Sequence, residues 1–157
     1  MKKAKVKKQD PKVILVMGGV CSGKTTYINK EHSKNCTNID AGKIFIELSK
    51  GEYYDFPSHL EDKLNKTGLK KLKTAIRKKE DIVIEVIGNN QELLNELINQ
   101  IKKINYKIDL VNLTCSIEEA KQRNENRNDD SISAYYCEPY HLNWFRQIVS
   151  EHSFNAI

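Results

Sequence analysis

Short apolar-rich runs predict strands at several places along the chain. They are Lys12-Val-Ile-Leu-Val-Met17, Asp81-Ile-Val-Ile-Glu-Val-Ile87 and Tyr106-Lys-Ile-Asp-Leu-Val-Asn-Leu113, with a weaker candidate at 36–39 that ends at Asp40. The run at 81–87 is apolar almost throughout, which is typical of a strand that is buried on both faces of a parallel sheet. The first run ends at Gly18-Gly19, which predicts a turn.

Between these runs, apolar residues at helical intervals predict helices at 24–31, 41–50, 57–79 and 90–104, and one more that opens with Ser116-Ile-Glu-Glu119. Gly51 is the expected C-terminal cap of the second helix. In the third stretch Gly68 predicts a break or kink, so one bent helix and a helical hairpin both fit. Strands that alternate with helices in this way predict an α/β fold with a parallel sheet sandwiched between helices.

Length and composition favour one domain. The chain has 157 residues, of which 39% are hydrophobic and 30% charged, and no repeat or Pro- or Gly-rich linker follows residue 12. We therefore expect a basic disordered tail at 1–11 and a single domain at 12–157. No apolar run approaches the roughly 20 residues of a membrane-spanning helix, so a cytoplasmic protein is expected. The four cysteines are too far apart for a zinc site and are expected as free thiols.

The net charge of +5 belongs to the tail. Residues 1–12 carry six lysines and one aspartate, and the remaining chain has 20 basic and 20 acidic side chains. A basic tail is usually a solvated end, and less often an arm that contacts phosphate polymers. The charge therefore leaves a nucleic-acid partner possible and does not require one.

One segment carries a specific chemical motif. Gly18-Gly-Val-Cys-Ser-Gly-Lys-Thr25 matches the phosphate-binding loop G-x-x-x-x-G-K-[ST] between a predicted strand and a predicted helix. Its backbone N–H groups are expected to face the phosphates of ATP or GTP, Lys24 on the exposed loop to neutralise their charge, and the Thr25 hydroxyl to hold Mg²⁺. The predicted nucleotide-binding residues are Gly18, Gly19, Val20, Cys21, Ser22, Gly23, Lys24, Thr25 and Thr26. We interpret Cys21 as a small filler rather than a reactive thiol.

Two acidic residues accompany predicted strand ends. Asp40 follows the second strand, where a carboxylate can accept the proton of a substrate hydroxyl that attacks the γ-phosphate. It can also cap the helix that begins at Ala41, and the two roles are compatible. Glu85 interrupts an apolar strand, where an unpaired buried charge would be costly. It can orient Mg²⁺ through water or bind a substrate hydroxyl, or else face solvent on an edge strand.

Arg123 and Arg127 stand four residues apart late in the chain. On a helix this spacing places both guanidinium groups on one face, which suits a lid that spans the phosphates and stabilises charge on the transferred group. A solvated helix face is the alternative.

Taken together, these segments resemble the zeta-toxin-like and polynucleotide-kinase-like branch of the P-loop kinases over about residues 12–150. The segments that carry the resemblance are Gly18–Thr25, Asn38-Ile-Asp40, Ile84-Glu-Val-Ile-Gly88 and Glu119-Ala-Lys-Gln-Arg123-Asn-Glu-Asn-Arg127. The resemblance implies a P-loop NTPase-type fold, Asp40 as candidate base, a substrate-facing Glu85 and a lid that carries the two arginines. Zeta-like proteins commonly have a second aspartate two residues after the first, where this chain has Gly42.

The predicted function is an ATP- or GTP-dependent, Mg²⁺-requiring kinase of a small-molecule hydroxyl, such as that of a nucleoside or nucleotide sugar. One alternative is a polynucleotide 5′-hydroxyl kinase, for which the Lys-rich stretch 63–79 and the tail would bind the backbone. Another, from a different class, is a nucleotide-binding switch or interaction module with slow NTPase activity. The acceptor pocket is expected from 41–80, where Tyr53, Tyr54 and Phe56 would stack on a substrate or pack in the core.

Overall fold

The computed structural model describes residues 10–19, 22–50, 58–126 and 138–155. Within these ranges four strands form one parallel sheet in the order β2-β3-β1-β4. This confirms the predicted α/β fold with a parallel sheet. In chain order the elements are β1 (Lys12–Met17), α1 (Lys24–Glu31), β2 (Cys36–Asn38), α2 (Ala41–Ser49), α3 (Ser58–Arg77), β3 (Asp81–Val86), α4 (Gln91–Lys103), β4 (Lys107–Asn112), α5 (Ile117–Glu125) and α6 (Glu138–Asn155).

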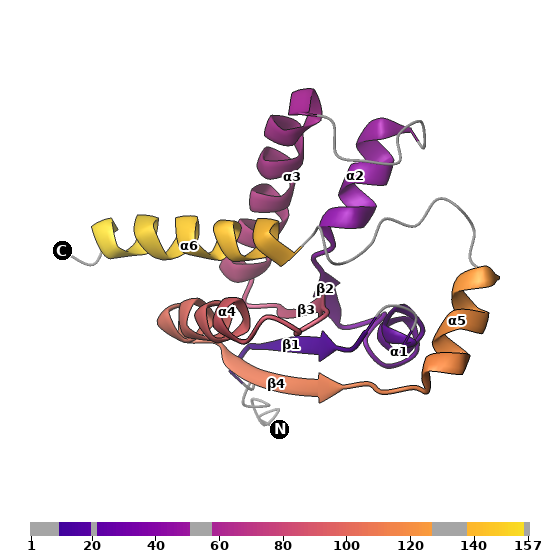
Figure 1. Ribbon diagram of the computed structural model, residues 1–157. Coiled ribbons are helices and arrows are strands. Elements are labelled where there is room, and N and C mark those ends of the chain that lie inside the picture. Colours follow the sequence, from indigo (N-terminus) through magenta and orange to yellow (C-terminus); the bar gives the residue numbers. More distant parts are fainter. Residues whose placement is uncertain (1–9, 20–21, 51–57, 127–137, 156–157) are drawn as a thin grey trace, which may run out of the picture.

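Helices cover both faces of the sheet, as predicted. On β1, Val13 and Leu15 belong to a large core that also holds residues of α2, α3, α4 and α6. Ile14 and Val16 point to the other face, where they form a smaller core with Ile28 of α1. Figure 1 shows α4 beside the sheet, with α6 farther out and α2 and α3 extending from the same side. The sheet is therefore a layer between one short helix and a group of four.

The third helix is unbroken. α3 runs through Gly68 from Ser58 to Arg77, so the helical hairpin is excluded and the expected break at Gly68 is wrong. A Cβ atom at Gly68 would collide with the indole ring of Trp144. The indole nitrogen of Trp144 also donates a hydrogen bond to the Asn65 side chain, at 2.8 Å. The glycine therefore serves the close approach of α6 to α3 and does not end the helix.

The sequence analysis predicted no helix after residue 127, yet α6 contributes much of the large core. Leu142, Trp144, Phe145 and Ile148 are all buried. Three of these residues have the helical spacing i, i+1 and i+4, but the position that would start the apolar stripe is a histidine, His141. A polar residue at that place hides the amphipathic pattern.

Several other predictions concern residues that lie wholly or partly outside the described ranges. The predicted tail at 1–11 lies outside them apart from Asp10 and Pro11, and so do Tyr53, Tyr54 and Phe56. Neither Cys36 nor Cys115 forms a disulfide within the described residues, and Cys21 and Cys137 lie outside them. Across the parts of the chain that the structure describes, the helices are too short or too polar to cross a bilayer.

Candidate active site

The predicted phosphate-binding loop lies between a strand and a helix, as its motif requires. β1 ends at Met17, and α1 begins at Lys24 directly after Gly23. Gly23 has φ +94°, a left-handed conformation that favours glycine, and its carbonyl accepts the Tyr27 N–H at 2.9 Å. This turn aims the N-terminus of α1 at the loop. Val20 and Cys21 fall outside the described residues, so the filler interpretation of Cys21 stays a prediction.

Lys24 is buried, in contrast to the exposed position expected from the sequence. Its side chain is 4% exposed, and its ammonium group donates to the carbonyls of Gly18 at 2.7 Å and Gly19 at 2.8 Å. The Glu85 carboxylate lies 3.9 Å away. A buried cation requires oxygen partners, and the loop backbone supplies them here. Phosphate oxygens offer a charged replacement for the same contacts.

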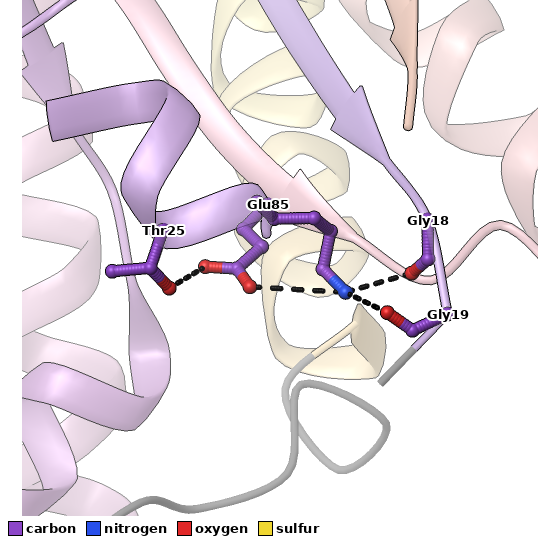
Figure 2. Close-up of polar contacts among 5 residues, drawn as sticks. Gly18, Gly19, Thr25 and Glu85 are labelled. Atoms are coloured by element: carbon purple, nitrogen blue, oxygen red, sulfur yellow. Dashed lines mark hydrogen bonds and ion pairs between the residues drawn. The ribbon is translucent and has the colours of Figure 1, made fainter. Parts of the chain in front are cut away.

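Glu85 lies on an interior strand and not on an edge, because β3 pairs with β2 on one side and with β1 on the other. The solvent-facing edge-strand interpretation is therefore wrong. The Thr25 hydroxyl donates to the Glu85 carboxylate at 3.3 Å, and Figure 2 shows the two side chains facing each other. One carboxylate thus contacts both the cation and the hydroxyl of the loop. This arrangement offers two oxygen donors side by side, which is the chemistry that Mg²⁺ prefers.

Asp40 caps α2, as one of its two predicted roles requires. Its carboxylate accepts the Lys43 N–H at 3.2 Å, while its other oxygen lies outside this cap. The ladder extends past β2, since the Ile39 N–H donates to the Val83 carbonyl at 3.1 Å. Asn38 is opposite Val83, so two residues further along the strands Asp40 is level with Glu85 and on the same face. The two carboxylates therefore share the carboxyl edge of the sheet with the loop.

Arg123 reaches the loop from α5. The Ser116 hydroxyl caps this helix by accepting the Glu119 N–H at 3.1 Å, which confirms part of the predicted capping box. A Cβ atom at Gly23 would lie 3.6 Å from a terminal guanidinium nitrogen of Arg123. The tertiary structure thus brings this arginine to the start of α1. Arg127 lies outside the described residues.

A comparison with models of known protein families shows to which family this chain belongs. The family model described as zeta toxin matches residues 1–156. The chain belongs to the zeta toxin family. This confirms the resemblance that the sequence segments indicated.

Solved structures share the fold of this zeta toxin family member. One, described as "Structure of the Pnkp1/Rnl/Hen1 RNA repair complex", has 16% sequence identity and a TM-score of 0.63, and covers 96% of this chain and 49% of the other. Another, described as "Structure of Pnkp1/Rnl/Hen1 complex", has 15% identity and a TM-score of 0.60, and covers 76% of this chain and 41% of the other. The chain therefore spans about half the length of these proteins or less. None of the curated proteins compared with it is similar.

The sequence analysis missed a histidine at this edge of the zeta-type fold. His141 of α6 is 1% exposed, and its Nε2 accepts the N–H of Ala41 at 3.2 Å, one residue after Asp40. Its Nδ1 has no hydrogen-bond partner among the described residues. Burial lowers the pKa of His141 to about 4, although the charge of Asp40 acts in the opposite direction. The spacing of His141 to Trp144 and Phe145 was the available signal, but it indicates a core position and not a role.

This histidine makes stability depend on pH. Its pKa is about 4 in the folded protein and 6.5 as the ordinary value, so between these limits only the unfolded chain binds the proton. Folding stability is therefore lost as the pH falls through this window and is unaffected by His141 above it. We expect a loss of roughly 3 kcal/mol from this group. Urea unfolding from pH 7.5 to pH 4 measures it, with His141→Gln as the control that cannot titrate. Parallel curves for the two proteins would contradict the expectation.

Proposed function

We propose that this protein is an ATP- or GTP-dependent kinase that transfers the γ-phosphate to a hydroxyl of a small molecule, such as a nucleoside or nucleotide sugar. The observation that carries the proposal is the placement of a candidate base, Asp40, on the same sheet edge as Lys24, Thr25 and Glu85. Transfer of a phosphate to a hydroxyl uses a base of this kind, whereas nucleotide binding alone does not. Membership in the zeta toxin family supports the phosphotransfer.

In this proposal the loop binds the nucleotide phosphates. Backbone N–H groups at the start of α1 face the anion, and the helix N-terminus adds a favourable field. Lys24 exchanges its contacts with the Gly18 and Gly19 carbonyls for phosphate oxygens. Because the ammonium group already lies within the loop, little motion is required for that exchange.

Thr25 and Glu85 are the residues that would hold Mg²⁺, since their oxygens lie 3.3 Å apart. When bound, the metal would neutralise part of the charge on the phosphates. The same pair anchors the start of α1 to β3, so the hydroxyl is held in one orientation. This role for Glu85 fits the contacts better than the direct binding of a substrate hydroxyl.

Glu85→Gln tests the metal role. We expect the Mg²⁺ concentration needed for half-maximal binding of a fluorescent ATP analogue to rise roughly 10- to 100-fold, because an uncharged amide holds the cation less well. Turnover should show the same shift. Glu92→Gln, which changes an exposed acid in the first turn of α4, is the matched control. An unchanged Mg²⁺ dependence in Glu85→Gln would show that the Glu85 carboxylate pairs with Lys24 and does not help to bind the metal.

Asp40 acts as the base in this proposal. The carboxylate oxygen outside the helix cap accepts the proton of the acceptor hydroxyl as that oxygen attacks the γ-phosphate. Arg123 stabilises the negative charge that spreads over the transferred group, because it approaches the loop at Gly23. Arg127, four residues later in the chain, is proposed to contribute to the same stabilisation.

Arg123→Ala should lower kcat by roughly 100-fold and change the Kd for nucleotide much less, because the guanidinium acts mainly on charge that develops during transfer. Arg123→Lys should rescue poorly, since an ammonium lacks the planar fork. Arg146→Ala, which removes an exposed arginine paired with Glu96, serves as the control. Steady-state kinetics together with a binding titration separate the two effects. A fully active Arg123→Ala enzyme would remove the arginine from the mechanism.

An acceptor screen tests the proposed function itself. Nucleotide consumption is measured with and without pooled nucleosides, nucleotide sugars and 5′-hydroxyl oligonucleotides, and products are identified by the mass gain of one phosphate. Turnover that depends on a small-molecule acceptor is expected. Hydrolysis that ignores every acceptor would instead favour a switch or interaction module.

A polynucleotide 5′-hydroxyl kinase is the second candidate, favoured by one observation. Five basic residues on α3 repeat at helical intervals and are all exposed, namely Lys63, Lys66, Lys70, Lys73 and Arg77. Lys73 forms an ion pair with Glu151 of α6 at 2.9 Å. The exposure of the other four basic residues is explained equally well if this side of α3 only faces solvent. If the acceptor is a nucleic acid, its KM should rise steeply with salt concentration. Deletion of residues 1–10 should then make the dependence of KM on salt less steep. We propose that this dependence is shallow and that 12–157 is the catalytic domain.

A further inference from the structure

We propose that His141 is a positioning residue for Asp40, because it holds the backbone segment that carries the base. This inference rests on the proposed function, because it assigns Asp40 the role of base. His141 comes from the opposite end of the chain, and its hydrogen bond is to the backbone N–H of Ala41, one residue after Asp40. Its effect is therefore indirect.

The peptide group between Asp40 and Ala41 is held at both of its polar atoms. Its carbonyl accepts the Ile44 N–H at 3.1 Å, as the first bond of α2, and its N–H donates to Nε2 of His141 at 3.2 Å. On the preceding side, the Ile39 N–H is bound to the Val83 carbonyl. These bonds fix the backbone on either side of the Asp40 Cα atom. The direction of the Asp40 side chain follows from that backbone.

The site requires an acceptor of this kind. Ala41 is 0% exposed, so water does not reach its N–H, which is one of the groups that a helix leaves unsatisfied at its N-terminus. Asp40 already accepts the Lys43 N–H. A further donor to the carboxylate would occupy its second oxygen. By taking the Ala41 N–H, His141 leaves the second Asp40 oxygen for a substrate proton.

A neutral imidazole suits this task. Nε2 accepts a hydrogen bond only when the ring is neutral and its proton is on Nδ1. Such a ring accepts the Ala41 N–H and brings no positive charge close to the base, whereas lysine and arginine are donors only and could not accept it. Burial against Trp144, with ring centroids 5.5 Å apart, keeps it in that form.

The position of His141 is itself fixed by the packing of α6 against α3. Trp144, one turn further along α6, donates to Asn65 at 2.8 Å and lies in the space that Gly68 leaves on α3. α6 therefore links the base to the long helix α3 and to the large core. Rigid support of this kind holds a catalytic group within the narrow range that transfer requires.

Two substitutions of His141 separate positioning from packing. Gln places its amide oxygen near the position of Nε2 and can accept the Ala41 N–H, whereas Asn is too short. We expect His141→Asn to lower kcat by about 10- to 100-fold with a nucleotide KM within about twofold, and His141→Gln to recover kcat to within about fivefold of wild type. Leu142→Ala, which removes core volume from the same helix, is the control. It should lower the Tm and leave kcat nearly unchanged at temperatures well below that Tm.

Nuclear magnetic resonance supplies a readout that does not depend on turnover. The ¹⁵N shifts of wild type should show an imidazole with the proton on Nδ1, and the Ala41 amide should exchange slowly in wild type and His141→Gln but fast in His141→Asn. Equal exchange in all three would overturn the hydrogen bond. Wild-type kcat in both His141 variants, or an equal loss in Leu142→Ala, would overturn the positioning role. A wild-type protein with the expected spectra but no acceptor-dependent turnover would instead contradict the proposed function, and with it the role of Asp40 as base.

Discussion

Lys24→Met is expected to abolish phosphotransfer while the protein stays folded. Methionine fills most of the space of the lysine stem but has no charge for the phosphates. Removal of a single group that stabilises transition-state charge typically lowers turnover by about 10²- to 10³-fold, and Lys24 also contributes to nucleotide binding. We therefore expect kcat/KM to fall by more than about 10³-fold. Steady-state kinetics and circular dichroism measure the two parts of the expectation.

The burial of Lys24 determines the choice of variant. Both alanine and methionine remove the cation beside the Glu85 carboxylate, but alanine would also leave a cavity in the buried site, which methionine largely fills. Lys30→Met, in the exposed last turn of the same helix, is the matched control and should retain full activity. Turnover near the wild-type rate in Lys24→Met would show that the loop assignment is wrong.

Asp40→Asn should reduce turnover by roughly 10²- to 10⁴-fold, the usual contribution of a general base, with little change in nucleotide affinity. Asparagine keeps the shape of the side chain and can still accept the Lys43 N–H, so α2 keeps its cap. The expected loss therefore arises from basicity alone. Acceptor-dependent kinetics and a nucleotide titration of the same preparation test it.

A second pair of variants separates capping from catalysis. Asn90 caps α4 as Asp40 caps α2, accepting the Leu93 N–H at 3.1 Å. Both Asp40→Ala and Asn90→Ala should cost about 1 kcal/mol of stability. Only Asp40→Ala should also lose turnover. If Asp40→Asn retains wild-type turnover while Asp40→Ala is merely unstable, Asp40 is a structural cap and the base lies elsewhere.

Local sequence patterns determined most of the fold and the nucleotide loop. The apolar runs of β1 and β3 could be recognised because a strand that is buried on both faces excludes polar residues along nearly its whole length. The loop motif was recognisable because a phosphate cradle needs glycines, a lysine and a hydroxyl at set positions within eight residues. Asp40 was identifiable because it directly follows the short strand candidate at 36–39. All of these signals lie within a few neighbouring residues.

The tertiary structure alone decided which distant residues meet. The strand order places β3 in the interior of the sheet, which brings Glu85 to Thr25 and Lys24 instead of to solvent. In the same way α6, which no local pattern revealed, brings His141 to the amide that follows Asp40. A glycine such as Gly68 has the same local signature whether it breaks a helix or admits an indole ring from elsewhere. Such contacts depend on the packing of elements far apart in the chain, and the spacing of residues within one element does not encode them.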